Sequence, residues 1–323
     1  MYRARVIYVG QSPVVLEWLC QHPRVELIKA YCPPSALSRS ELFTCSLHYG
    51  VPLSWARDSA ELEASLPVGL DLAVCAFFER ISPRLLERAR LGWLNLHPAP
   101  LPERPGRYPT IEGVLAGDLC WGATLHWMTS ALDQGPIIDV AYAPRGWKDG
   151  PAELEARALS LGLSLLERHL DAILDGYSTC EDQPPLPAHR ADRRLPTLSL
   201  EQGPLSAWRA VRACAPFGGL PMRYGQRLVW IKEARLTPLL SGAPDEPHAE
   251  GWSTLAHWTG AQPCRLEARL EVVEVGVAPV SQLTLERVAR VARTPWRLPS
   301  EARLEPLSEQ ERALFTFEDG GVR

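Results

Sequence analysis

Residues Arg5 to His22 read RVIYVGQSPVVLEWLCQH, and this stretch decides the fold class. Its first six residues form an apolar run rich in β-branched side chains that ends in glycine, as buried strands do. Ser12 then offers a helix cap, and Pro13 stands at the first helical position, where proline is favoured. A buried strand followed at once by a capped helix is the unit of an open α/β sheet. We therefore expect an α/β fold for this part of the chain.

The same alternation of strand and helix signals continues to about residue 180. The run DLAVCAFF reads as the second buried strand, and Ser82 with Pro83 repeats the cap-and-proline start of a helix. Apolar residues recur at helical spacing before Gly176, which predicts a long amphipathic helix with a glycine stop. The further expected strands are 71–78, 92–97, 121–128 and 135–143. Two expected helices begin at Pro13 and Pro83, and two more span 110–117 and 151–175.

The rest of the chain has a different character. The chain has 323 residues, which is long for one compact core, so two domains are expected. Residues 181–204 are rich in proline and charge, which is typical of a linker. Beyond them a short helix at 205–213 and strands around a Tyr-Gly-Gln turn predict a small β-rich domain. We expect a first domain at 1–180, a linker at 181–204, and a second domain with a polar tail at 205–323.

Composition excludes several classes of function. Hydrophobic residues make up 46% and charged residues 22%, as in ordinary globular proteins, and no apolar run is long enough to span a bilayer. The first residues do not resemble a signal peptide, so we expect a cytoplasmic protein. Residues 181–323 contain 18 basic and 18 acidic side chains, which argues against binding a phosphate backbone. Eight scattered cysteines without a C-x-x-C motif argue for free thiols and against a metal site.

Four prolines follow one histidine closely in NLHPAPLPERPG, residues 95–106. If a strand ends here, Asn95 and His97 lie two residues apart and emerge on the same side, in the crevice where open α/β sheets place ligands. The prolines restrict the loop to one exit direction, which suits a catalytic pair. The alternatives are that His97 is an ordinary buried histidine and that Asn95 caps a turn.

Asp133 precedes a glycine and the next predicted strand. A carboxylate is the usual partner that fixes the orientation of a working histidine, although an Asx-turn would also explain it. Together, NLHPAPLP, GATLH and DQG resemble the formyltransferase family that uses 10-formyltetrahydrofolate, whose pattern is Asn-x-His-x-x-x-Leu-Pro, Gly-x-Thr-x-His and Asp-x-Gly. The resemblance covers residues 3–180, and it continues more faintly into a second domain. It implies a Rossmann-like catalytic domain followed by an OB-like barrel.

The resemblance implies roles for particular residues. Asn95, His97 and Asp133 would form the catalytic trio. Asn95 would donate a hydrogen bond to the formyl oxygen, and His97 would support the developing negative charge or accept the amine's proton. Asp133 would hold His97 and relay the proton onward. The pterin of 10-formyltetrahydrofolate would lie against two loops, although ordinary strand-end packing is an equal alternative there. The implied pterin contacts are Phe78, Arg80, Ile81, Gln134 and Gly135, and the implied acceptor contacts are Gly10, Ser12, Pro100, Arg104 and Arg107.

Three departures from the family concern the acceptor. The usual Ser-Leu-Leu-Pro is Ala-Pro-Leu-Pro at 99–102, the usual Tyr-Arg-Gly is Arg-Pro-Gly at 104–106, and a Gly-Thr-Pro near the first strand is replaced by GQSP at 10–13. With the neutral second domain, these changes favour a small-molecule amine, either on a nucleotide-linked amino sugar or in a secondary metabolite, over methionyl-tRNA. The same motifs are also compatible with hydrolysis of 10-formyltetrahydrofolate and with a folate-binding scaffold that has no activity. No membrane or metal is expected, and a homodimer is possible.

Overall fold

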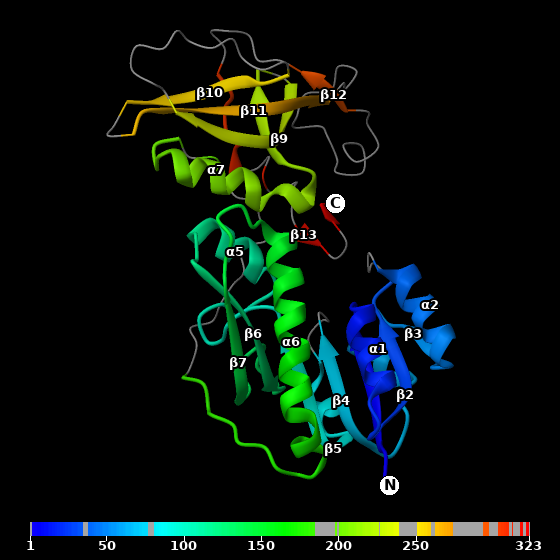
Figure 1. Ribbon diagram of the computed structural model, residues 1–323. Coiled ribbons are helices and arrows are strands. Elements are labelled where there is room, and N and C mark those ends of the chain that lie inside the picture. Colours follow the sequence, from blue (N-terminus) through cyan, green and yellow to red (C-terminus); the bar gives the residue numbers. More distant parts are fainter. Residues whose placement is uncertain are drawn as a thin grey trace. The chain divides into compact units, whose positions relative to one another are not determined.

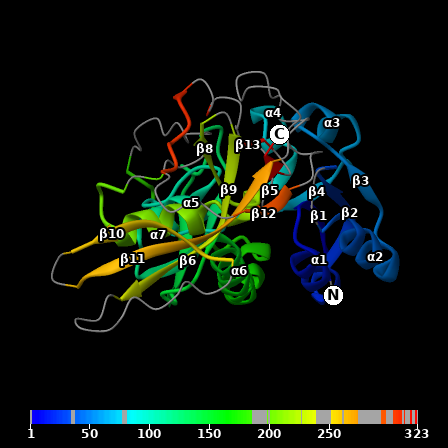
Figure 2. The ribbon, with the colours of Figure 1, turned by 90° about the horizontal axis from the view of Figure 1, so that it is seen from above.

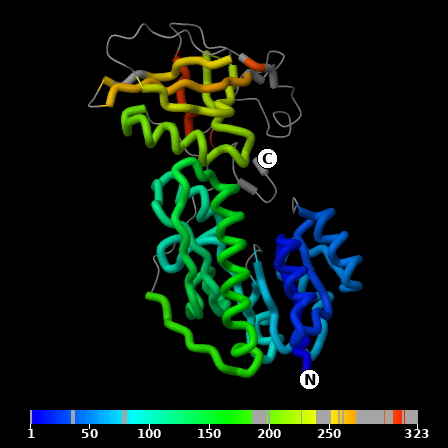
Figure 3. The backbone as a smooth tube through the Cα atoms, viewed as in Figure 1, coloured from blue at the N-terminus to red at the C-terminus, as the bar shows by residue number. Residues whose placement is uncertain are grey.

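The structure is a computed structural model of the whole chain, coloured by residue number in Figure 3. It describes the following residues: 2–34, 38–76, 81–184, 198, 200–225, 227–238, 251–259, 262–273, 293–296, 303–309, 312, 317–318 and 321–322.

A seven-stranded mixed sheet forms the centre of the first part of the chain (Figure 1). Its five parallel strands, β1 to β5, follow the order β3-β2-β1-β4-β5, and β6 and β7 extend the sheet in antiparallel pairing. Strands β1 and β4 are almost entirely buried and mostly apolar, as expected where helices cover both faces of a parallel sheet. The bounds are β1 Ala4–Gly10, β2 Val25–Cys32, β3 Leu53–Trp55, β4 Leu70–Ala76, β5 Ala89–His97, β6 Cys120–Trp127 and β7 Ile137–Pro144.

Helices lie on the two faces of this sheet, so the part is a three-layer α/β structure. Figure 2 shows α1 (Pro13–Gln21) and α6 (Pro151–Leu174) on one face, and α3 (Ser59–Ala64) and α4 (Pro83–Leu86) on the other. Helix α6 packs closely on the sheet: a Cβ on Gly162 would lie 3.3 Å from Leu96 of β5. Two further helices are α2 (Arg39–Tyr49) and α5 (Pro109–Ala116). The α/β fold expected from the sequence is confirmed.

Several local predictions are confirmed and others are wrong. The Ser12 hydroxyl accepts from the Val15 amide and caps α1, as predicted, and Gly176 follows α6 with φ +81°. The prediction that 71–78 is the second strand is wrong, because β2, α2, β3 and α3 precede it. The helix expected within 81–90 is only one turn long. Residues from Ala89 onward pair with β4 instead, and Arg90 binds Asp71 at 2.8 Å.

The described residues of the second part include an antiparallel half-barrel sheet and the helix α7. Strands β8 and β9 form a hairpin across the predicted Tyr-Gly-Gln turn, and β11 pairs with β9 on one side and with β10 and β12 on the other. Helix α7 begins with a proline and packs on β9, where Trp208 Nε1 donates to the carbonyl of Ala234 at 3.1 Å. The bounds are α7 Pro204–Ala213, β8 Leu220–Tyr224, β9 Arg227–Pro238, β10 Ser253–Trp258, β11 Cys264–Val273 and β12 Arg293–Trp296, followed by a pair β13 Phe317–Glu318 and β14 Gly321–Val322.

The chain divides into two compact units. The first contains Met1–Thr110, Asp118–Trp147 and Glu153–Ala191, and the second contains Ile111–Gly117, Lys148–Ala152 and Asp192–Arg323. Within the described ranges, no helix combines the length and the apolar character needed to cross a membrane.

Candidate active site

The carboxyl ends of three parallel strands meet at one edge of the seven-stranded sheet. The strand register pairs Gly10 with Ala76 and Ala76 with Leu96, so β1, β4 and β5 end side by side. His97 is the last residue of β5, and Asn95 lies two residues earlier on the same side of the strand. Open α/β sheets bind their ligands at this edge. The candidate site is therefore at the end of β5.

The ring of His97 is buried and held in one tautomer. Its Nε2 lies 2.7 Å from the carbonyl oxygen of Arg104. A carbonyl oxygen can only accept a hydrogen bond, so Nε2 carries the proton and donates it. In the neutral ring, Nδ1 is then a proton acceptor. It faces Asp133 Oδ1 at 3.6 Å, and a proton arriving at Nδ1 would be stabilised by that carboxylate.

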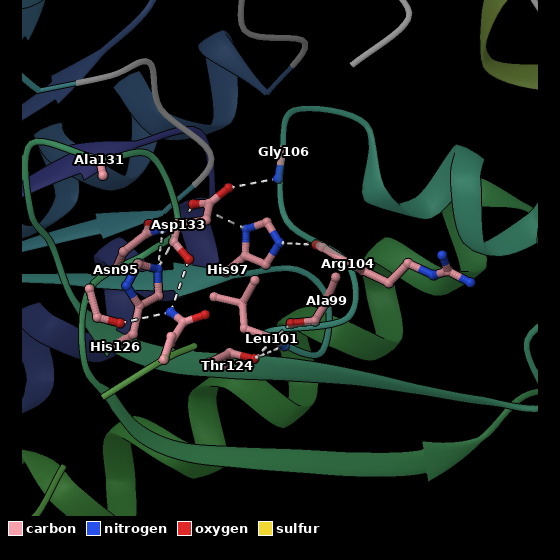
Figure 4. Close-up of polar contacts among 12 residues, drawn as sticks. Asn95, His97, Ala99, Leu101, Arg104, Gly106, Thr124, His126, Ala131 and Asp133 are labelled. Atoms are coloured by element: carbon pink, nitrogen blue, oxygen red, sulfur yellow. Dashed lines mark hydrogen bonds and ion pairs between the residues drawn. The ribbon is translucent and has the colours of Figure 1, made fainter. Parts of the chain in front are cut away.

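Asp133 lies in a tight turn between β6 and β7, and only 6% of its surface is exposed. Its φ of 53° is in the left-handed region, which aspartate tolerates better than most residues. Asp133 Oδ2 accepts the amide of Gly106 at 2.8 Å, and Figure 4 shows its carboxylate beside the His97 ring. Gly135 is required in this turn because a Cβ there would lie 1.7 Å from the carbonyl oxygen of Trp127.

Asn95 is oriented by a second buried histidine. His126 Nδ1 lies 2.9 Å from the Trp127 carbonyl oxygen and donates to it, so His126 Nε2 accepts a hydrogen bond from Asn95 Nδ2 at 3.0 Å. Burial lowers the pKa of His126 to about 4, although the carboxylate of Asp133 acts in the opposite direction. The ring is therefore neutral near pH 7. This bond uses one hydrogen of the Asn95 amide and leaves the other for a ligand.

The proline-rich loop after β5 is tied down at both ends. Thr124 on β6 donates to the carbonyl of Ala99 at 2.8 Å and accepts the amide of Leu101 at 2.9 Å. Further on, the guanidinium of Arg104 binds Asp118 through two bonds of 2.8 and 2.7 Å. The loop therefore holds the Arg104 carbonyl against His97 and the Gly106 amide against Asp133, which fixes both catalytic candidates.

The remaining candidate residues have varied surroundings. Gly10 leaves no room for a side chain, since a Cβ would lie 2.3 Å from the Ala76 carbonyl, and the hydroxyl of Ser12 caps α1. Ile81 is buried in the apolar core of the sheet, and Gln134 is exposed. Pro100 is buried, while the Arg107 guanidinium lies 5.7 Å from the ring of Tyr108.

Phe78 and Arg80 lie outside the described residues, so their predicted pterin contacts stay predictions.

Three residues of this site had no role predicted from the sequence. His126 and Thr124 belong to the Gly-x-Thr-x-His motif, so their alternation on one strand was a usable signal. Gln183 lies within the predicted linker, yet its amide donates to the carbonyls of Asp133 and Gly135 at 2.9 and 2.7 Å. No local pattern marks it, because the contact spans about fifty residues of sequence.

The chemistry available at this edge is acyl transfer. Asn95 offers a hydrogen-bond donor for a developing oxyanion, His97 Nδ1 can accept a proton, and Asp133 can stabilise the resulting charge. Within the described part of the chain, no group of three or more metal-ligating side chains is present.

Comparisons with known proteins agree with this chemistry. A family model described as formyl transferase matches residues 36–170. The methionyl-tRNA formyltransferase of Phenylobacterium zucineum is 37% identical over 121 residues, which are 37% of this chain and 39% of that protein. The methionyl-tRNA formyltransferase of Halorhodospira halophila is 29% identical over 251 residues, covering 75% of this chain and 77% of that one. The chain spans about half or less of the first curated relatives it matches, 39 to 50% of their length.

A solved structure shares the fold over both parts of the chain. It is the N-formyltransferase from Helicobacter canadensis in complex with folinic acid and dTDP-3-aminofucose. The TM-score is 0.59 at 16% sequence identity, over 83% of this chain and 99% of that one.

Proposed function

The chain belongs to the formyl transferase family, and from this membership we propose that it moves a formyl group from 10-formyltetrahydrofolate to the amine of methionyl-tRNA. The observation that carries the proposal is the meeting of Asn95, His97 and Asp133 at the end of β5, inside the matched region. The three side chains supply what formyl transfer needs, which is an oxyanion donor, a proton acceptor and a carboxylate partner.

In the proposed reaction, the acceptor nitrogen forms a bond to the formyl carbon while the carbon's bond to N10 of the folate breaks. The free hydrogen of Asn95 Nδ2 donates to the formyl oxygen as negative charge develops there. The amine must lose a proton, and N10 must gain one. His97 Nδ1 accepts the amine's proton because its Nε2 is already committed to the Arg104 carbonyl. Asp133, 3.6 Å away, stabilises the imidazolium until the proton passes to the departing N10.

The formyl donor would lie against the loops that follow β4 and β6. The proposed contacts Gln134 and Gly135 lie in the turn that bears Asp133, and backbone groups suit the hydrogen-bonding edge of a pterin. The absence of a side chain at Gly135 lets this turn approach β6 closely. The predicted contacts Phe78, Arg80 and Ile81 would complete the slot from the β4 side.

The choice of acceptor rests on how far the relatives extend. The match to the Halorhodospira halophila protein covers 75% of this chain. Residues 1–180 make up a smaller share of the chain than that, so the match includes part of the second unit. We therefore propose methionyl-tRNA as the acceptor, whereas the sequence alone favoured a small-molecule amine. The predicted domain limits of 1–180, 181–204 and 205–323 are retained as a proposal.

A small-molecule amine, for example on a nucleotide-linked sugar, is the second candidate acceptor. The observation that favours it is the acceptor loop. Arg104 stands where the family usually has tyrosine, and its guanidinium is bound to Asp118. The predicted acceptor contacts Gly10, Ser12, Pro100, Arg104 and Arg107 belong to this proposal.

The test is a transfer assay with 10-formyltetrahydrofolate and two acceptors, methionyl-tRNA and a panel of nucleotide-linked amino sugars, with products identified by mass spectrometry. We expect formylmethionyl-tRNA from the wild-type chain and none from a correctly folded His97→Ala variant. Formylated sugar without formylmethionyl-tRNA would decide for the second candidate. Release of formate without any amine would instead indicate a hydrolase.

A further inference from the structure

The segment after α6 runs back along the start of β7, as the backbone trace in Figure 3 shows. Ile137 and Glu181 exchange both backbone hydrogen bonds, each at 2.8 Å, in an antiparallel bridge. Continuing this register by two residues places Gln183 opposite Gly135. The segment that looked like a linker therefore reaches the turn that carries Asp133.

The side chain of Gln183 holds this turn at two points. Its Nε2 donates to the carbonyl of Asp133 at 2.9 Å and to the carbonyl of Gly135 at 2.7 Å. Its Oε1 is buried and has no hydrogen-bond partner among the described residues. A buried acceptor left unpaired costs about 1–3 kcal/mol. Rotating the amide would not help, because Oε1 would then face two carbonyl oxygens. The site therefore retains this cost and keeps both amide hydrogens on the turn.

The turn needs such a contact because its conformation is unusual. Asp133 has a left-handed backbone, and Gly135 is packed directly on the backbone of β6. The carboxylate of Asp133 is anchored separately, through Oδ2 to the amide of Gly106. Gln183 and Gly106 thus fix the backbone and the side chain of Asp133, and together they set its distance to His97.

We propose that Gln183 is a positioning residue for formyl transfer, which clamps the Asp133–Gly135 turn and so holds the Asp133 carboxylate at His97. This inference rests on the proposed function. It assigns Gln183 no contact with either substrate.

Gln183→Met removes both donors while nearly preserving the size of the side chain. We expect kcat to fall about 10- to 100-fold, since small misplacement of catalytic groups can cost about 100-fold. The KM for the acceptor should change by less than about threefold, because none of the proposed acceptor contacts lies in the Asp133–Gly135 turn. Gln21→Met is the matched control, since Gln21 is exposed at the end of α1 and its side-chain amide donates to the surface side chains of Glu17 and Tyr49. It should keep wild-type kcat.

Gln183→Glu allows a measurement whose result would not depend on pH if Gln183 had only a structural role. An ionised carboxylate repels the two carbonyl oxygens, whereas a protonated carboxyl can donate to one of them. We expect the ratio of variant kcat to wild-type kcat to rise as the pH is lowered from 8 to 5.5. A ratio that does not change with pH would contradict the clamp.

A third measurement does not depend on activity. Hydrogen exchange of the Gly106 amide, which is bonded to Asp133 Oδ2, should be at least about tenfold faster in Gln183→Met than in the wild type or in Gln21→Met. Wild-type kcat and unchanged Gly106 exchange in Gln183→Met would overturn the inference. If the wild type transfers no formyl group to any acceptor, the proposed function fails, and Gly106 exchange still decides the role of Gln183.

Discussion

The neutral state of His126 determines how Asn95 is presented to a ligand. Nε2 of His126 can accept from the Asn95 amide only while it carries no proton. Protonation would place two donors face to face in a buried site. The low pKa of about 4, caused first by burial, keeps the ring neutral over the working pH range. Asn95 is therefore held with its second amide hydrogen available at neutral pH.

This arrangement predicts a specific loss of stability in acid. The folded-state pKa of His126 is about 4 and its usual value is 6.5. The stability that the neutral His126 ring contributes to the fold is therefore fully present above pH 6.5, and it is lost as the pH falls toward 4. Between pH 7 and 4.5, the wild-type free energy of unfolding should fall about 2 kcal/mol more than that of His126→Gln. Urea unfolding at both pH values measures this, and equal losses in the two proteins would contradict it.

Asn95 itself gives a second prediction at this scale. Asn95→Ala removes the donor proposed for the formyl oxygen, and loss of one such donor costs about 100- to 1,000-fold in kcat. We expect that loss with KM values changed by less than about threefold, because the donor acts mainly in the transition state. Steady-state kinetics with both substrates varied provide the measurement. A variant that keeps more than a tenth of wild-type kcat would remove Asn95 from the catalytic trio.

The loop after β5 shows what proline content does and does not predict. The sequence predicted a stiff exit from a strand, and β5 does end at His97 with the loop directly beyond it. The contacts that hold the loop come from elsewhere: Thr124 lies on β6, and Asp118 precedes it. Alternation along one strand predicts which side chains share a face, but it carries no information about a partner on another strand.

Thr124 is the element-scale test of this loop. Thr124→Val keeps the shape and leaves the Leu101 amide and the Ala99 carbonyl unpaired in a buried site, so we expect destabilisation of about 2 kcal/mol. Because the same loop carries the Arg104 carbonyl and the Gly106 amide, kcat should also fall about tenfold. Thr44→Val is the control, since that hydroxyl lies on the exposed face of α2 and donates to the carbonyl of Ser40. Equal stability of the two variants would show that Thr124 does not anchor the loop.

Over the whole chain, the order of strands and helices was predictable where apolar runs were clear. Strand β2 was missed because Glu26 and Lys29 interrupt its apolar run, and α2 was missed because its apolar residues are few and irregularly spaced. Gln183 was missed for a different reason. A proline-rich composition is typical of a linker, and composition does not reveal that Glu181 pairs with β7 before the prolines begin. Such long-range pairing requires the three-dimensional structure.

The charge pattern of the second unit bears on the acceptor. Trp252 of this unit lies beside Arg235 and Arg269, 4.3 and 5.0 Å from its ring centroid. Both arginines are paired with glutamates of the same sheet, Arg235 with Glu267 at 2.7 Å and Arg269 with Glu233 at 3.5 Å. Ion pairing reduces the positive charge that these two arginines offer a tRNA backbone, so we expect them to make few phosphate contacts.

The salt dependence of the reaction tests this consequence. With about two phosphate contacts, affinity for a nucleic acid falls roughly tenfold between 50 and 200 mM salt. We expect kcat/KM for methionyl-tRNA to fall by about that factor, and kcat/KM for a small amine to change less than about twofold. Initial rates in KCl at fixed pH measure both. If the fall for methionyl-tRNA is below twofold, the tRNA makes no significant backbone contact, and the small-molecule amine becomes the better acceptor.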